Sequence, residues 1–401
     1  MSGPATTAPA WTWTFRGLVF LYGPIIALAP KGAVILLLLS ALIVAGRWLT
    51  TTPRQSGGQA LRATLRRLVP WLVLFIAAWM LIRLALPSPE PQNPLLWFKV
   101  LVLSLAGLTV LSGYASAAGA DRHALATAWL YGLAAGLLLM ALAEVHAQIT
   151  DTALWGPKVR TLIAMEPGRA VLVFALWPAL ALIRQRLGVA TATLLAAVAL
   201  GCLLLVHDGV GATAWLVGIA VLAVAGMGGV AGRALAIGAI AGVALAIPAG
   251  ALLLNLTPGA AATDLLPFSA LHRLSIWDFA ATRIAASPWI GIGGDGVRYL
   301  AETFRPAYAP VAGDAIALLP LHPHNGFLQA WLEFGLPGLV LALALVVTVA
   351  RAAAERGPAA LAGTAGAVMV ASVAFGLWQS WWLSSLWLTV AIAAALLPHR
   401  H

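Results

Sequence analysis

Two histidines, two residues apart, stand directly before an apolar helical pattern in the stretch LHPHNGFLQAWLEFG, residues 321–335. An imidazole titrates near neutral pH and can take a proton from a hydroxyl group. Asn325 is suited to cap the helix that follows, and a helix N-terminus attracts anions through its unpaired N–H groups. The stretch therefore indicates general-base chemistry on an anionic substrate, with His324 as the base. For His322 a role in capping fits better.

Arginines elsewhere in the chain provide the positive charge that such chemistry needs. Arg169 begins an apolar span, and Arg160 lies shortly before it. Arg273 opens an amphipathic stretch, one helical turn before Trp277 and on the same face. Guanidinium groups bind phosphate through paired hydrogen bonds, so we expect Arg169 and Arg273 to hold a phosphate or diphosphate. For Arg160, phosphate binding and snorkelling to lipid headgroups both remain open.

The sequence has no motif for chemistry that depends on a nucleotide or a metal. Residues 291–296, GIGGDG, match G-x-G-x-x-G, but they follow a helical pattern rather than the strand that a dinucleotide site requires. A flexible turn is the expected structure there. Walker, H-E-x-x-H and C-x-x-C motifs are absent, and the acidic residues form no cluster suited to Mg²⁺. We expect neither a cofactor nor a metal.

The composition requires a membrane. Of the 401 residues, 62% are hydrophobic and 9% are charged, whereas soluble domains carry about 25% charged residues. The apolar runs have the length that crosses a bilayer, and they are continuous rather than alternating, which predicts helices and not a barrel. We expect an all-α polytopic membrane protein with about twelve transmembrane helices. The expected spans are 15–29, 32–46, 68–86, 95–117, 123–145, 169–183, 188–206, 210–228, 232–254, 326–349, 358–377 and 381–397.

The distribution of basic residues orients these spans. Arginines recur in alternate connections, which places those connections and both termini in the cytoplasm by the positive-inside rule. This pattern accounts for most of the net charge of +10, so no nucleic-acid partner is expected. The two long connections, 146–168 and 255–325, then face outward, and long structured connections usually carry function. We expect one membrane domain, 1–401, with short amphipathic helices of 255–325 forming a lid over the active site.

The order of these motifs resembles the O-antigen ligase family of the lipopolysaccharide pathway, within the wider group that includes O-antigen polymerases. The order is a helix that opens with Arg169, a long outward loop, R-x-x-x-W at 273–277, P-x-x-G-I-G at 288–293, and H-N-x-x-L-x-x-x-x-E-x-G from His324 to Gly335. The last motif is the most specific of them. The essential histidine of the family falls on His324, and two of its arginines fall on Arg273 and Arg169.

The resemblance implies a glycosyltransferase with a fold like that of the GT-C enzymes, in the bacterial inner membrane with its active site on the periplasmic face. Such an enzyme moves O-antigen polysaccharide from undecaprenyl diphosphate to the lipid A-core oligosaccharide. Together with the residues above, this predicts metal-independent, inverting transfer with His324 as general base and Arg273 stabilising the leaving group. The expected partners are the donor, the acceptor and membrane lipids, and the expected state is a monomer.

Two acidic residues complete the set of candidates. Many members of the family carry an arginine in a Ser/Thr-rich stretch where this sequence reads VHDGVGATAWL, residues 206–216. Asp208 stands there and is a secondary candidate, although a solvated turn suffices to explain it. Glu333 lies about two turns into its helix, and a buried arginine is its expected partner.

Three alternatives remain open. An O-antigen polymerase uses the same carrier for donor and acceptor, and a protein O-oligosaccharyltransferase moves glycan to protein hydroxyls; both would share these motifs. A secondary transporter belongs to another class. It would place ionisable residues at mid-membrane and interrupt helices in corresponding halves, and the sequence shows no such paired interruption.

Overall fold

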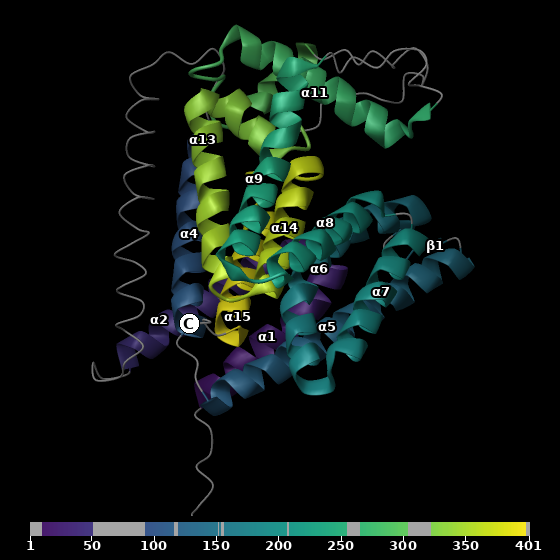
Figure 1. Ribbon diagram of the computed structural model, residues 1–401, viewed down its shortest axis with the longest axis vertical. Helices are drawn as coiled ribbons and strands as arrows, with labels where there is room; N and C mark the ends of the chain where they lie inside the picture. Colours follow the sequence, from purple (N-terminus) through teal and green to yellow (C-terminus); the bar gives the residue numbers. More distant parts are fainter. Residues whose placement is uncertain are drawn as a thin grey trace, which may run out of the picture. The chain divides into compact units, whose positions relative to one another are not determined.

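The computed structural model describes residues 10–50, 93–115, 119–150, 152–153, 156–206, 208–254, 265–303 and 322–397. In these ranges the chain is helical, apart from short connections and one antiparallel pair of two-residue strands, β1 (Thr152–Ala153) and β2 (Gly156–Pro157). The fold is therefore all-α, as the composition predicted (Figure 1).

The helices follow the expected spans closely. Each expected span except 68–86, which lies outside the described residues, coincides with a helix. The helices are α1 (Ala10–Leu28), α2 (Ala33–Thr50), α4 (Pro94–Ala115), α5 (Gly119–Thr150), α6 (Lys158–Leu187), α7 (Val189–Leu205), α8 (Gly209–Gly226), α9 (Gly229–Leu253), α11 (Phe268–Ala286), α13 (Gly326–Ala354), α14 (Pro358–Val373) and α15 (Ser380–Leu396), with 3-10 helices η1 (Pro30–Gly32) and η2 (Gly296–Thr303).

The described helices have the length and exposure of membrane spans. Seven of them are long and apolar enough to cross a bilayer, and four shorter apolar helices accompany them. Large apolar side chains such as Leu42, Leu138 and Leu345 are exposed on their surfaces, which is the arrangement that lipid as solvent favours. The chain is a multi-pass membrane protein.

The chain divides into two compact units, which are described separately. The first contains residues 1–71, 101–215 and 380–401, and the second contains 72–100 and 216–379. In the first unit α1 packs along α5. The two backbones approach closely at Gly23, Gly132 and Gly136, where an added Cβ atom would overlap the backbone of the facing helix.

The second unit contains the histidine motif. Here α13 packs beside α9 and α14 (Figure 1). Helix α11 lies against the end of α9 and the first turns of α13, because Ile276 and Ala280 share a buried cluster with Ala251, Leu328 and Leu332. The long connection 255–325 thus contains a helix, α11, which ends at Ala286 with Ser287 as its C-cap, at the predicted stop Ser287-Pro288.

Helix α13 is interrupted at Gly335, which has the left-handed φ of 68°. Pro337 has no N–H, so it cannot bond to the carbonyl of Glu333 four residues earlier. The loop 288–293 takes up the bonds that the interruption frees: Ile292 N–H donates to Leu332 and Gly293 N–H to Glu333 (both 2.9 Å), while Leu336 N–H donates to Pro288 (2.8 Å). The glycine segment therefore forms a turn, as predicted, and backbone hydrogen bonds hold this turn against α13.

Candidate functional site

Asn325 caps α13 and ties it to the end of α14. Its Oδ1 accepts the N–H of Leu328 at 2.7 Å, which confirms the predicted N-cap, and its Nδ2 donates to the carbonyl of Ser372 at 2.7 Å. The side chain is fully buried. The residue before it, His324, has its backbone position fixed by both bonds.

Removing these bonds should destabilise the protein without changing any charge. We expect Asn325→Ala to cost about 2 kcal/mol or more, because it removes an N-cap and leaves the buried carbonyl of Ser372 unpaired. Asn325→Asp, which does add a charge, keeps the cap oxygen but replaces the donor to Ser372 with a buried carboxylate oxygen, so it should also destabilise the protein. Thermal unfolding of the purified protein in detergent measures both, and an unchanged midpoint for Asn325→Ala would contradict this role.

The backbone and the hydrogen bond of His324 define its tautomer. The residue has a left-handed φ of 52°, a conformation that costs a non-glycine residue about 1–3 kcal/mol and is found most often at functional sites. Its Nδ1 lies 2.7 Å from the carbonyl oxygen of Ala374. A carbonyl only accepts hydrogen bonds, so Nδ1 carries the proton and Nε2 of the neutral ring keeps a lone pair. His324 therefore presents a base at Nε2.

Arg273 is anchored on the same helix end. Its Nε donates to the carbonyl of Val373 at 2.8 Å and its Nη1 to the carbonyl of Ser269 at 3.1 Å. One turn further along α11, Trp277 donates from Nε1 to the carbonyl of Pro323 at 3.0 Å. Trp277 thus fixes the segment 322–324, which carries both histidines, to α11. Arg273 brings positive charge beside His324.

Three consecutive carbonyls at the end of α14 therefore hold the site. Those of residues 372, 373 and 374 accept from Asn325, Arg273 and His324 respectively. The last carbonyls of a helix have no partner within the helix and carry the negative end of its dipole. They bind donors well, and they stabilise positive charge on the arginine and on a protonated imidazole.

His322 is positioned by a fixed hydrogen-bond pattern. Its Nδ1 accepts the N–H of His324 at 3.2 Å, and its Nε2 lies 2.9 Å from Nε2 of Gln379. A neutral imidazole has one acceptor nitrogen, so Nε2 must donate, and the Gln379 amide must be turned to present its oxygen. In the described residues that oxygen otherwise has no hydrogen-bond partner. His322 is a support for His324, whose ring centroid lies 4.8 Å away.

The three imidazoles of this region are neutral at pH 7. Burial lowers the pKa of His322 to about 3, with help from the positive charges that His324 and Arg298 can carry. Burial also lowers the pKa of His324 to about 4, although the bond to Ala374 acts in the opposite direction. The pKa of His272, whose ring lies 6.2 Å from that of His324, is lowered by burial and by Arg273.

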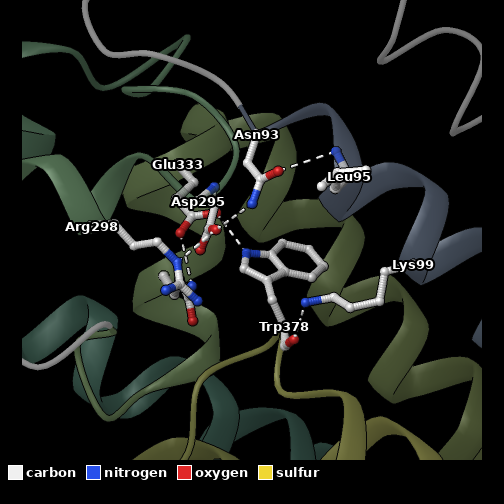
Figure 2. A network of polar contacts seen from close by, with 8 residues as sticks. Asn93, Leu95, Lys99, Asp295, Arg298, Glu333 and Trp378 are labelled. Carbon is white, nitrogen blue, oxygen red and sulfur yellow. Dashed lines mark hydrogen bonds and ion pairs between the residues drawn. The ribbon is translucent and has the colours of Figure 1, made fainter.

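Glu333 lies at the centre of a second cluster (Figure 2). It is fully buried and accepts three hydrogen bonds, from the N–H of Asp295 at 2.9 Å, from Trp378 Nε1 at 2.7 Å and from Gln329 Nε2 at 2.8 Å. The expected arginine partner is not among these donors. The nearest arginine of the cluster, Arg298, is bound to the carboxylate of Asp295 instead.

Residues 373–379, which connect α14 to α15, join the two clusters. The carbonyls of Val373 and Ala374 bind Arg273 and His324. Leu377 N–H donates to the side chain of Gln329, and Trp378 Nε1 donates to Glu333. The amide of Gln379 bonds to His322. Lys99 also donates to the carbonyl of Trp378 at 2.7 Å. Sequence reasoning missed this connection and Arg298. The available signal was the polar Gln379 and the Trp378 ring in a short connection between two apolar spans.

Arg169 and Asp208 belong to the first unit, where they form an ion pair. Arg169 Nε lies 3.4 Å from Asp208 Oδ2, and both side chains are largely buried. Asp208 Oδ1 also accepts the N–H of Gly211 at 2.9 Å and caps α8. Asp208 is therefore a buried partner of Arg169, and its interpretation as a solvated turn was wrong. The backbone of Arg160 lies in α6, and its side chain is outside the described ones.

The chain is a helical multi-pass membrane protein in which His324 lies near the anchored guanidinium of Arg273. Residues 168–343 match the family model described as "O-Antigen ligase". This part of the chain is therefore similar to the O-antigen ligase family, in agreement with the resemblance of the motifs from Arg169 to Gly335.

Two similar proteins have names consistent with this family. The chain is 34% identical over 136 residues to "Putative polysaccharide ligase RP358" of Rickettsia prowazekii, covering 32% of this chain and 33% of that protein. It is 32% identical, over the same lengths, to "Putative polysaccharide ligase RT0347" of Rickettsia typhi. The chain thus matches about a third of the length of these relatives. Both names describe a polysaccharide ligase.

Proposed function

We propose that the protein transfers O-antigen polysaccharide from undecaprenyl diphosphate to the lipid A-core oligosaccharide. The observation that carries this proposal is the tautomer of His324. Its Nδ1–H donates to the carbonyl of Ala374, so Nε2 can act as a base. Arg273 donates to the carbonyl of Val373, the residue before Ala374. The match of residues 168–343 to the O-antigen ligase family model supports ligase chemistry. The proposal includes an inner-membrane location, cytoplasmic termini, a monomer, and a periplasmic lid formed by residues 255–325.

In the proposed reaction, Nε2 of His324 takes the proton of an acceptor hydroxyl while the hydroxyl oxygen attacks the anomeric carbon of the donor. The bond between that carbon and the diphosphate oxygen breaks, and the diphosphate leaves with the electron pair. Attack opposite the leaving group inverts the anomeric configuration. Arg273 stabilises the negative charge that develops on the diphosphate, and we assign the same role to Arg169. These guanidinium groups supply the charge that a metal would otherwise contribute.

The end of α14 favours this proton transfer. When His324 becomes an imidazolium, its Nδ1–H bond to Ala374 becomes charge-assisted and stronger. The negative end of the helix dipole stabilises the same charge. A bound diphosphate acts in this direction too, so the pKa of His324 should rise when the donor binds and approach the range in which a general base works best.

The pH dependence of the rate tests this role. In the free enzyme the pKa of His324 is lowered to about 4, so the base form persists from neutral pH down to about pH 5. We expect kcat/KM for the donor to stay nearly constant over that range and to fall below it. The acidic limb of kcat should lie at higher pH, because the donor raises the pKa. Rates from pH 4 to 8 measure both limbs, and a kcat/KM that rises on acidification would contradict the assignment.

Transfer in a reconstituted system tests the proposed function directly. Purified protein in proteoliposomes should move labelled polysaccharide from undecaprenyl diphosphate to lipid A-core, and the product is seen by gel electrophoresis. The lipopolysaccharide of a deletion strain separates this function from the related ones. Polymerised O-antigen that accumulates on the carrier indicates a ligase, whereas lipopolysaccharide with single repeats indicates a polymerase. Solute uptake by the same proteoliposomes without transfer would favour a transporter.

A further inference from the structure

Arg298 is a second guanidinium near the histidines, and the mechanism above gives it no role. It lies in η2, and its Nε lies 2.7 Å from Oδ2 of Asp295. The Asp295 side chain is buried, with an exposed fraction of 5%, whereas the exposed fraction of the Arg298 side chain is 44%. Among the described residues this contact engages Nε alone. Both terminal amino groups of Arg298 thus remain as hydrogen-bond donors.

The loop that carries Arg298 is fixed in position. Its residues 288–293 bond to the interruption in α13, as described above. Asp295 has a left-handed φ of 62°, and its N–H donates to the buried carboxylate of Glu333. The carboxylate of Asp295 accepts from Asn93 at 3.1 Å as well as from Arg298 (Figure 2). A guanidinium oriented in this way loses little conformational entropy when it binds an anion.

A short chain of hydrogen bonds connects this loop with His322. Glu333 accepts from both Asp295 and Trp378, and Gln379, the residue after Trp378, holds His322. The positive charge of Arg298 contributes to the low pKa of His322, as that of Arg273 does for His324. Each histidine of the pair thus has its own arginine within electrostatic range.

We propose that Arg298 binds a phosphate group of a substrate lipid through its terminal amino groups, and that Asp295 and Glu333 are positioning residues for it. The identity of the lipid rests on the proposed function. The phosphate belongs either to the undecaprenyl diphosphate carrier or to a phosphorylated lipid A-core acceptor. A guanidinium can bind one phosphate through two parallel hydrogen bonds, whereas the ammonium group of a lysine cannot form this bidentate contact.

Equilibrium binding to the purified full chain in detergent tests this inference and needs no transfer reaction. The probes are undecaprenyl diphosphate, phosphorylated lipid A-core, and lipid A-core with its phosphates removed. Arg298→Gln should raise the Kd of one of the two phosphorylated lipids about tenfold or more. If the affected lipid is the acceptor, removing its phosphates should abolish the difference between wild type and variant. Arg283→Gln, which removes an arginine that lies over the ring of Phe279 in the last turn of α11, is the matched control and should leave Kd unchanged.

Two further variants separate binding from a purely structural role. Asp295→Asn keeps the backbone bond to Glu333 and tolerates the left-handed φ, so it should weaken binding of the same lipid by a smaller factor. Arg298→Lys can keep the ion pair with Asp295 but lacks the planar guanidinium that binds phosphate through two hydrogen bonds. If Arg298→Gln does not fold, the Kd of Arg298→Lys tests the inference instead. A folded Arg298 variant that binds both phosphorylated lipids within twofold of wild type overturns the inference. If the wild-type protein transfers no glycan but Arg298→Gln still weakens binding of a phosphorylated lipid, the inference about Arg298 is supported and the proposed function is rejected.

Discussion

Replacing His324 with asparagine should lower the rate of transfer by about 10²–10⁴-fold, the usual contribution of a general base. Asparagine tolerates the left-handed φ of this position, and its amide N–H can replace the bond from Nδ1 to the carbonyl of Ala374. The variant should therefore keep its thermal stability and lose only the base. His324→Ala should lose transfer to a similar extent, with an additional loss of stability because the carbonyl of Ala374 is left unpaired.

The control for this experiment removes an imidazole elsewhere. His123 is exposed on α5 in the first unit, next to Arg186. His123→Asn should transfer glycan at the wild-type rate. Initial rates with purified donor and acceptor, both at saturating concentration, measure kcat for all variants. Wild-type kcat for a folded His324→Asn variant would show that another group, or water alone, takes the proton.

Replacing Arg273 with glutamine should lower kcat by about 10²–10³-fold, the cost of losing one donor that stabilises charge in the transition state. The charge on the diphosphate grows as its bond to the sugar breaks, so the loss should appear in kcat more than in the KM of the acceptor. Arg273→Lys keeps the charge, but one ammonium group cannot replace the guanidinium bonds to Val373 and Ser269. Its rate should lie between those of wild type and Arg273→Gln.

Stability measurements distinguish this effect from misfolding. Loss of the bonds from Arg273 to two carbonyls should cost about 1–3 kcal/mol, because the end of α14 loses a charged donor. Arg283→Gln again serves as the control, since it removes the same charge from the same helix. If a folded Arg273→Gln variant retains kcat within a few-fold of wild type, Arg273 is an anchor of α11 and not part of the chemistry.

Local patterns made much of the fold and part of the site predictable. Apolar runs of membrane length located the helices because lipid requires each span to satisfy its own backbone. The N-cap at Asn325 was predictable because capping depends on a side chain and an N–H three residues apart. His324, Arg273 and Trp277 were found from motif spacing, and the structure brings them together at the ends of α11, α13 and α14.

The remainder depends on contacts between residues far apart in the sequence. The carbonyls of Val373 and Ala374 belong to residues without functional side chains, so no residue type marked them as the support of the site. The glycines at 291 and 293 indicated backbone freedom, but the partner of this turn is created 40 residues later by Gly335 and Pro337. Glu333 accepts from Trp378 and Asp295, which no helical spacing relates to it.

The proposed role of Arg169 at the diphosphate follows from the resemblance to the O-antigen ligase family. Its partner Asp208 lies in the same unit, and His324 lies in the other. If Arg169 binds the diphosphate as proposed, its guanidinium exchanges the carboxylate of Asp208 for a phosphate when the donor binds.

A cryo-electron microscopy structure of the full chain with undecaprenyl diphosphate bound tests the central claim most directly. The account predicts a diphosphate within hydrogen-bonding distance, about 3 Å, of Arg273. It also predicts that Nε2 of His324 faces the volume beside the diphosphate where an acceptor hydroxyl would enter. A diphosphate bound away from Arg273, or a His324 ring whose Nε2 is turned into the protein, would contradict it.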